Sequence, residues 1–111
     1  MDESQFKTLR ELAKDSTLSQ RDLSKKVGLS VGRVNYLINA LLEKGYIKAK
    51  RFKNSKNKIG YMYILTPEGV SERIVQTQAF LRKKTEDYKR LRKEIELLER
   101  EQLENPHKEI K

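Results

Sequence analysis

The sequence contains no cysteine and only one histidine, His107. Without cysteine the chain cannot form a disulfide or a thiolate metal site, and it has no thiol for redox sensing. No clustered metal ligands and no Ser/His/Asp arrangement accompany His107. The glycines are too scattered to form a P-loop or a dinucleotide-binding motif. We therefore expect a protein that is not an enzyme and that uses no cofactor and no metal ion.

Long hydrophobic runs are also missing. No segment approaches the roughly 20 apolar residues that a membrane-spanning helix needs. The N-terminal residues lack the basic stretch and the apolar run of a signal peptide. Hydrophobic residues make up 36% of the 111 residues and charged residues 37%, so the hydrophobic core must be modest. These proportions predict a soluble intracellular protein with one domain and an appendage.

Acidic residues are absent from residues 46–66, although the whole chain has 16 of them. The cations of the same stretch are Lys48, Lys50, Arg51, Lys53, Lys56 and Lys58. This stretch therefore contributes most of the formal net charge of +9, which favours a polyanionic partner. The alternative is a solvated sheet edge that uses lysines to prevent aggregation, but that explains the absence of acids less well.

Residues 19–45 have the pattern of two short helices joined by a tight turn. Ser19, with an acid three residues later, is typical of a capping box. Gly28 suits the left-handed conformation that ends many helices, and Ser30 can cap a second helix that stops at Gly45. This arrangement predicts a helix-turn-helix.

The second of these helices has two different faces. Its apolar residues recur at helical spacing and predict a buried face that consists of Val34, Leu37, Ile38 and Leu41. The opposite face has no acid, and we expect it to enter the major groove of DNA with Ser30, Gly32, Arg33, Asn35, Tyr36 and Asn39. Asparagine can pair with adenine edges, and arginine with guanine or phosphate. The alternative interpretation is an ordinary solvated face.

Two further segments complete the expected DNA-binding domain. Residues 4–15 predict a first helix with Ser4 as its N-cap. The apolar face of this helix consists of Phe6, Leu9, Leu12 and Ala13. Residues 46–52 and 59–65 flank a turn-like composition and predict a β-hairpin. The expected fold class is mainly α with a small β-hairpin (α+β), and residues 1–66 would form a winged helix-turn-helix.

The last expected element is a long helix over residues 67–104, which begins with Thr66 as N-cap and Pro67 in the first position. Its heptad positions follow one another in steps of four and three, which is the period of a coiled coil, although three of them, Thr77, Lys84 and Gln102, are polar. A narrow apolar stripe needs a partner helix. We expect two copies to dimerise through Ile74, Leu81, Tyr88, Leu91, Ile95 and Leu98. The neighbouring charges leave parallel and antiparallel pairing open, and residues 105–111 are expected to form a frayed tail.

The expected wing and helix termini would hold the DNA backbone, since much of such an interface is made with phosphate and sugar. We expect these contacts from Ser19, Gln20, Lys25, Lys26, Lys50, Arg51, Lys53, Asn54, Lys56 and Lys58. A dimer would place two recognition helices about 34 Å apart, which predicts a palindromic operator.

Two stretches carry a resemblance to a known family, GRVNYLINALLEKG and FKNSKNKIGYMYILTPEG. Together they resemble the MarR-type winged-helix transcriptional regulators, and they are especially similar to a bacterial subgroup associated with exopolysaccharide gene clusters. The resemblance covers residues from about 5 to 100. It implies a homodimeric, sequence-specific regulator of double-stranded DNA in the bacterial cytoplasm, associated with the nucleoid, with polysaccharide biosynthesis genes as candidate targets.

The chain also departs from the pattern of that family. Larger members bring helices from both chain ends into a dimerisation domain and bind aromatic ligands beside it. Here the N-terminal extension is almost missing, and only one long C-terminal helix is expected. A small-molecule effector is therefore doubtful.

Two other function classes remain open. One is a winged-helix adaptor whose basic surface binds an acidic protein and whose coiled coil serves as a second binding arm, because a fold alone does not determine function. The other is a non-specific nucleic-acid-binding or RNA-binding module. An adaptor would not need Arg33, Asn35 and Asn39 on the outward face of one helix, and this favours sequence-specific binding of DNA.

Overall fold

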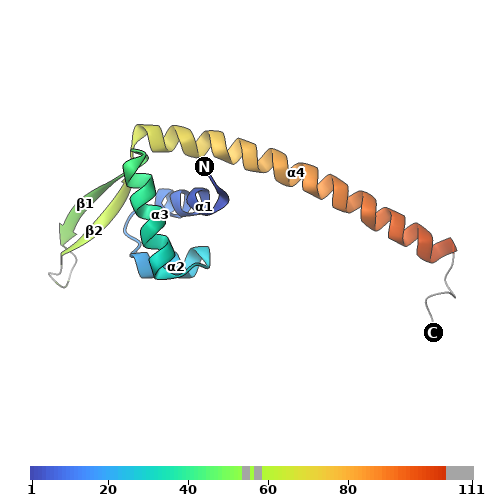
Figure 1. Cartoon of the computed structure of the whole chain (residues 1–111), viewed down its shortest axis with the longest axis horizontal. Coiled ribbons are helices and arrows are strands. Elements are labelled where there is room, and N and C mark those ends of the chain that lie inside the picture. Colours follow the sequence, from blue (N-terminus) through green and yellow to red (C-terminus); the bar gives the residue numbers. More distant parts are fainter. Residues whose placement is uncertain (54–55, 57–58, 105–111) are drawn as a thin grey trace. The chain divides into compact units, whose positions relative to one another are not determined.

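The computed structural model describes residues 1–53, 56 and 59–104. Three short helices are followed by an antiparallel two-stranded hairpin and a long helix, as Figure 1 shows. The elements in chain order are α1 (Glu3–Lys14), α2 (Gln20–Val27), α3 (Val31–Glu43), β1 (Ile47–Lys53), β2 (Ile59–Leu65) and α4 (Pro67–Glu104). This order confirms the predicted fold class.

The chain divides into two compact units, Met1–Gln76 and Thr77–Lys111. Helix α4 begins in the first unit and continues through the second, which is described as far as Glu104. The sequence analysis placed the end of the first domain at residue 66, before this helix. Among the described helices, none combines the length and the apolar character that crossing a bilayer would require.

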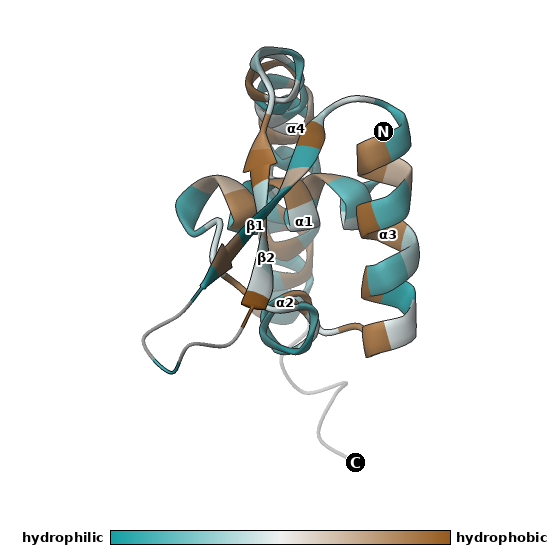
Figure 2. Cartoon of the chain, turned by 90° about the vertical axis from the view of Figure 1, so that its left-hand side faces the viewer, coloured by the Kyte–Doolittle hydropathy of each residue, from teal (hydrophilic) through white to brown (hydrophobic). Residues whose placement is uncertain are grey.

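The core of the first unit lies where α1, α2 and α3 meet. In Figure 2 the apolar residues of α3 lie mainly on the side of the helix that faces α1. The side chains that are almost completely buried include Leu9, Leu12, Leu23, Val34, Leu37, Ile38 and Leu41. Leu18 and Ile47 add to this core from the segment before α2 and from the start of β1. The predicted buried face of α3 is therefore confirmed.

The beginning of α1 differs from the prediction. Asp2, not Ser4, is the N-cap, and its carboxylate accepts a hydrogen bond from the backbone amide of Gln5 at 2.7 Å. Ser4 lies inside the helix, where its carbonyl accepts the hydroxyl of Thr8 at 2.9 Å. That hydrogen bond allows Thr8 to be fully buried, whereas Ala13, which was predicted for the apolar face, is exposed.

The predicted ends of α2 and α3 are confirmed. The hydroxyl of Ser19 accepts the amide of Asp22 at 3.0 Å, and the amide of Ser19 donates to the Asp22 carboxylate at 3.2 Å. These hydrogen bonds with the Ser19 side chain and backbone hold the pKa of Asp22 below its usual range. Gly28 has a φ of 71°, and the Ser30 hydroxyl accepts the amide of Arg33 at 3.1 Å.

The hairpin is fastened to the helices at its base. Its strands pair in register from Ile47 opposite Leu65 to Lys53 opposite Ile59. The backbone amide of Tyr63 donates to the carbonyl of Ser16 at 3.2 Å, which ties β2 to the segment between α1 and α2. The turn predicted for residues 54–58 has only its central residue, 56, among the described residues.

The start of α4 is hydrogen-bonded to the residues just before β1. The amide of Thr66 donates to the carbonyl of Tyr46 at 3.0 Å, and its hydroxyl donates to the carbonyl of Gly45 and accepts the amide of Gly69. Gly69 is buried, and a Cβ atom there would lie 1.9 Å from the Tyr46 carbonyl oxygen. Residue 69 must therefore be glycine for the start of α4 to approach Tyr46 this closely.

We expect Gly69→Ala to lower the free energy of unfolding by about 1–3 kcal/mol, because the new methyl group must push two backbone segments apart. Gly32→Ala is the matched control. It also lies in the first turn of a helix, but a Cβ there meets no atom within 4 Å. Urea unfolding followed by circular dichroism measures both variants. Equal stability of the two variants would contradict the close contact at Gly69.

Candidate nucleic-acid interface

The outward face of α3 is exposed and carries no acidic residue between its start and Leu42. The structure places on the accessible surface all of the residues that were predicted to contact bases, namely Ser30, Gly32, Arg33, Asn35, Tyr36 and Asn39. Tyr36 is 61% exposed. A Cβ at Gly32 would point into open space, so this part of the helix can be approached closely. The geometry required of a groove-reading surface is thus present on one helix face.

Arg33 and Tyr36 form a stacked pair on this face. The guanidinium carbon of Arg33 lies 5.1 Å from the centroid of the Tyr36 ring, which is within the range of a cation–π contact. The contact restricts the long arginine side chain without using its hydrogen-bond donors. Arg33 therefore presents a partly ordered fork of donors, which suits phosphate oxygens or the edge of guanine.

The two asparagines of α3 belong to a chain of hydrogen bonds that reaches α2. The amide nitrogen of Asn39 donates to the side-chain oxygen of Asn35 at 3.2 Å, and the amide nitrogen of Asn35 donates to the side-chain oxygen of Gln20 at 3.2 Å. The amide nitrogen of Gln20 lies 3.5 Å from the hydroxyl of Tyr63 in β2. No pattern in the sequence predicts these hydrogen bonds, because 15 residues separate Gln20 from Asn35, and Gln20 was expected to contact phosphate.

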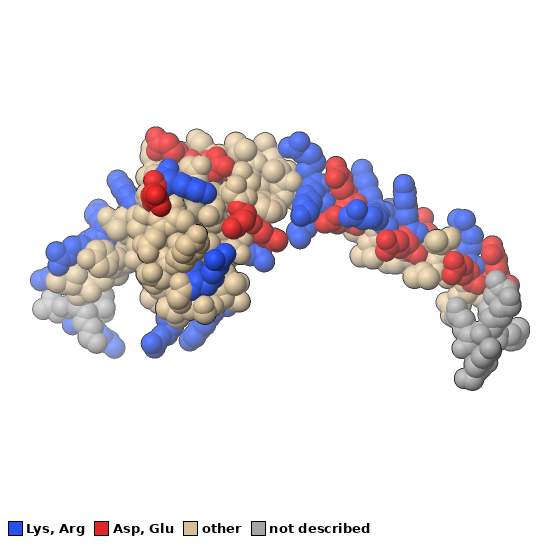
Figure 3. Space-filling view, in the orientation of Figure 1, with Lys and Arg blue, Asp and Glu red and all other residues tan. Residues whose placement is uncertain are grey.

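Cations surround the outward face of α3. Lys25 and Lys26 are exposed in the last turn of α2. In Figure 3 blue side chains follow the hairpin and gather around α2, while the red side chains of this view lie outside the hairpin. Ser19 is exposed at the start of α2, but its hydroxyl already accepts a backbone amide within the capping box. The remaining lone pair of the Ser19 hydroxyl could still accept a hydrogen bond from a ligand. The backbone amides in the first turn of α2 that have no partner within the helix could donate hydrogen bonds to a ligand.

The hairpin carries cations on both of its faces, since successive residues of a strand point to opposite sides. Lys48 and Lys50 lie on one face of β1, and Arg51 and Lys53 lie on the other. All four are exposed, as is Lys56 in the turn. Arg51 pairs across the hairpin with Tyr61, which is 55% exposed. The wing contacts predicted for Asn54 and Lys58 lie outside the described residues.

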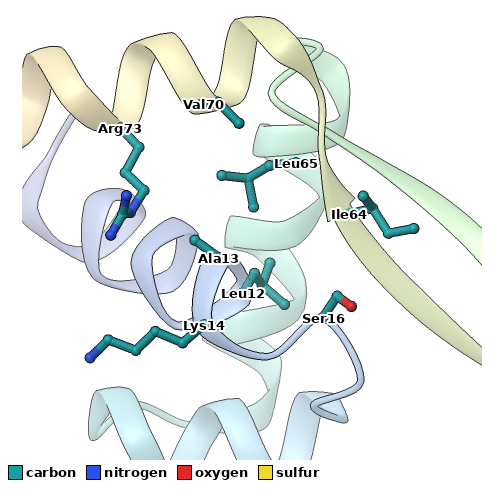
Figure 4. Close-up of a pocket in the computed structure, with 8 residues that line it drawn as sticks. All are labelled: Leu12, Ala13, Lys14, Ser16, Ile64, Leu65, Val70 and Arg73. Carbon is teal, nitrogen blue, oxygen red and sulfur yellow. The ribbon is translucent and has the colours of Figure 1, made fainter.

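An open cavity of about 410 Å³ lies where the end of α1, the end of β2 and the start of α4 meet. It is lined by Leu12, Ala13, Lys14, Ser16, Ile64, Leu65, Val70 and Arg73. In Figure 4 the apolar side chains of Leu65 and Val70 point into this space, and Lys14 extends away from it. The volume lies within the range of small-molecule sites. Among the described residues, no group of three or more potential metal ligands comes together.

The apolar stripe predicted for the long helix is exposed in the single chain. Among the six predicted dimer residues in α4, the side chain of Ile95 has the smallest exposed fraction, 46%, and that of Leu81 the largest, 64%. The exposed fractions of Ile74, Tyr88, Leu91 and Leu98 lie between these values. Two ion pairs of this segment, Arg90 with Asp87 and Arg92 with Glu96, are formed within the helix itself. Such a run of exposed apolar side chains is typical of an interaction surface.

Comparison with known proteins agrees with this geometry. Residues 1–48 match the family described as "Winged helix-turn-helix DNA-binding". The fold is a winged helix-turn-helix. No curated protein matches the chain at a significant level.

Solved structures resemble the chain over almost its whole length. The Multiple Antibiotic Resistance Repressor, MarR, is 20% identical, with 96% of this chain and 75% of that chain covered and a TM-score of 0.68. MepR, a transcription regulator of the Staphylococcus aureus multidrug efflux pump MepA, is 19% identical, with 100% and 81% covered and a TM-score of 0.62. A MarR/EmrR family transcriptional regulator from Acinetobacter sp. ADP1 is 22% identical, with 99% and 78% covered and a TM-score of 0.62. At these identities the likeness is one of fold.

Proposed function

We propose that this protein is a transcriptional regulator of the MarR type that binds double-stranded DNA sequence-specifically and is not an enzyme. The observation that carries the proposal is the acid-free, exposed face of α3 beside a hairpin that carries only cations among its charged residues. Both belong to a winged helix-turn-helix. The second helix of such a motif, here α3, typically enters the major groove. A polyanion with a groove of helix width matches this surface.

The residues of the surface divide into two proposed roles. Arg33, Tyr36 and Asn39 lie on the exposed face of α3, where side chains would reach base edges. The cations of the wing and of the end of α2 would bind phosphates, and they would supply most of the affinity without distinguishing sequences. The amides at the start of α3 add a further site for a phosphate group.

The structural neighbours support a regulatory role. MarR is described as a repressor, and MepR as a transcription regulator of a multidrug efflux pump. The sequence resemblance to regulators associated with exopolysaccharide gene clusters supports genes of polysaccharide biosynthesis as targets. In this proposal the protein acts in the bacterial cytoplasm, where it is associated with the nucleoid.

We further propose that the protein acts as a homodimer through α4. The exposed apolar stripe recurs with the period of a coiled coil, and a second copy presents an identical stripe. A twofold-symmetric pair would present two recognition helices to one side of a duplex. Half-sites about one helical turn, or 34 Å, apart would then give a palindromic operator.

Selection of bound sequences from a random duplex pool tests the proposed function. We expect enrichment of a palindromic consensus, because both copies of α3 would read the same half-site. Enrichment of single half-sites would contradict the dimer, and no enrichment at all would contradict sequence-specific binding. The latter result would favour the adaptor or the non-specific module.

Replacing Lys50, Lys53 and Lys56 together with alanine should weaken binding to all duplexes alike. The slope of log affinity against log salt should fall by about 0.9 for each lost phosphate contact, as counterions are no longer released there. The matched control replaces Lys83, Lys89 and Lys93 of α4 with alanine, which removes the same charge outside the proposed interface. An equal change of slope in both variants would remove the wing from the interface.

The double variant Leu91→Lys/Ile95→Lys should be a monomer by light scattering, because it places charge inside the proposed stripe. The control Leu97→Lys/Leu103→Lys makes the same kind of change at apolar residues that are exposed but off the stripe. It should remain a dimer. A dimer in both cases, or a monomer in both, would show that the stripe is not the interface.

A further inference from the structure

We propose that Gln20 is a positioning residue for base recognition, which orients the amides of Asn35 and Asn39 so that Asn39 reads an adenine. This inference rests on the proposed function and deepens it. The sequence alone assigned Gln20 to phosphate and treated both asparagines as equal readers of bases. The structure distinguishes the three residues by the hydrogen bonds that they make with one another.

The hydrogen bonds run in one direction along the three side chains. Asn39 donates to Asn35, and Asn35 donates to Gln20, with both distances at 3.2 Å. The Asn35 amide therefore uses its oxygen toward one neighbour and its nitrogen toward the other. If Asn35 were turned over, nitrogen would face nitrogen and oxygen would face oxygen, and both bonds would be lost. The orientation of Asn35 thus depends on the acceptor that Gln20 supplies.

Asn39 is the last of the three side chains that these hydrogen bonds connect. The side-chain oxygen of Asn39 accepts none of the hydrogen bonds found among the described residues, and its nitrogen has a second hydrogen beyond the one given to Asn35. Asn39 is exposed and therefore offers one acceptor and one donor outward. Adenine presents the complementary pair in the major groove, a donor at N6 and an acceptor at N7. Asn35 keeps a second hydrogen and a second lone pair, but both ends of its amide are held by neighbouring side chains, so we assign it a supporting role.

Gln20 is well placed to hold this arrangement. It is the first residue of α2 and lies within the capping box between Ser19 and Asp22, which fixes the backbone there. Its side chain is only partly exposed, and its nitrogen lies 3.5 Å from the hydroxyl of Tyr63. That distance is long for a hydrogen bond. The wing tyrosine therefore supports Gln20 weakly, and the link between Gln20 and Asn35 is the one on which the orientation depends.

The test compares binding of the full chain to its selected duplex, to duplexes changed at single A·T pairs, and to a random duplex. Asn39→Ala should lose roughly tenfold or more of its discrimination at one A·T pair. Gln20→Ala should lose at least about threefold at the same pair, with unchanged affinity for random DNA and an unchanged salt slope. The double variant should discriminate no worse than Asn39→Ala alone, because both changes remove one interaction.

Three further variants make the result interpretable. Gln20→Met keeps the length of the side chain without the amide, and it should behave like Gln20→Ala if that variant folds poorly. Tyr63→Phe should retain most of the discrimination. Lys25→Ala, a proposed phosphate contact, should weaken binding to every duplex and reduce the salt slope.

Distinct results would overturn the inference. An equal loss of affinity for every duplex in Gln20→Ala would make this neutral residue a phosphate contact, and additive losses of discrimination in the double variant would make it independent of Asn39. In both cases the wild-type chain still selects a site, so the proposed function stands. A wild-type chain without any sequence preference overturns the proposed function, and the inference falls with it.

Discussion

The burial of one face of α3 determines which residues its opposite face presents. Val34, Leu37, Ile38 and Leu41 are almost completely removed from water. Each such side chain stabilises the buried arrangement by roughly 1.5–3 kcal/mol relative to exposure. Rotating the helix by one residue would expose several of them at once. The rotational setting of α3, and with it the exposure of Tyr36 and its neighbours, is therefore fixed by the core and not by any partner.

The position of the hairpin depends on backbone contacts at its base. Ile47 enters the core, and the amide of Tyr63 bonds the segment that precedes α2. At the other side Thr66 and Gly69 hold the start of α4 against Tyr46. Apart from the Ile47 side chain and the Thr66 hydroxyl, these contacts use main-chain groups. The solvent-facing positions of β1 are therefore free to be mostly basic, whereas β2 carries no charged residue. The concentration of cations in the wing therefore costs the fold little.

The sequence predicted most of the features whose cause is local, although it indicated Ser4 where Asp2 caps α1. The caps at Ser19 and Ser30 and the end of α2 at Gly28 each depend on residues within three positions, and the structure confirms them. The packing of Gly69 against Tyr46 could not be predicted, because it joins elements that are distant in the chain. For the candidate site, exposure followed from helical periodicity. The hydrogen bond from Asn35 to Gln20 did not, because no pattern in the sequence indicates which amides will meet in space.

The amide chain that leaves α3 has a consequence for attempts to transplant this surface. A designer who grafts the residues of α3 alone onto another scaffold would transfer Asn35 and Asn39 but leave behind the acceptor that α2 contributes. The grafted amides could then turn over freely in solution. The smallest portable unit of this surface is therefore the pair of helices with the turn at Gly28 between them, and not the second helix by itself.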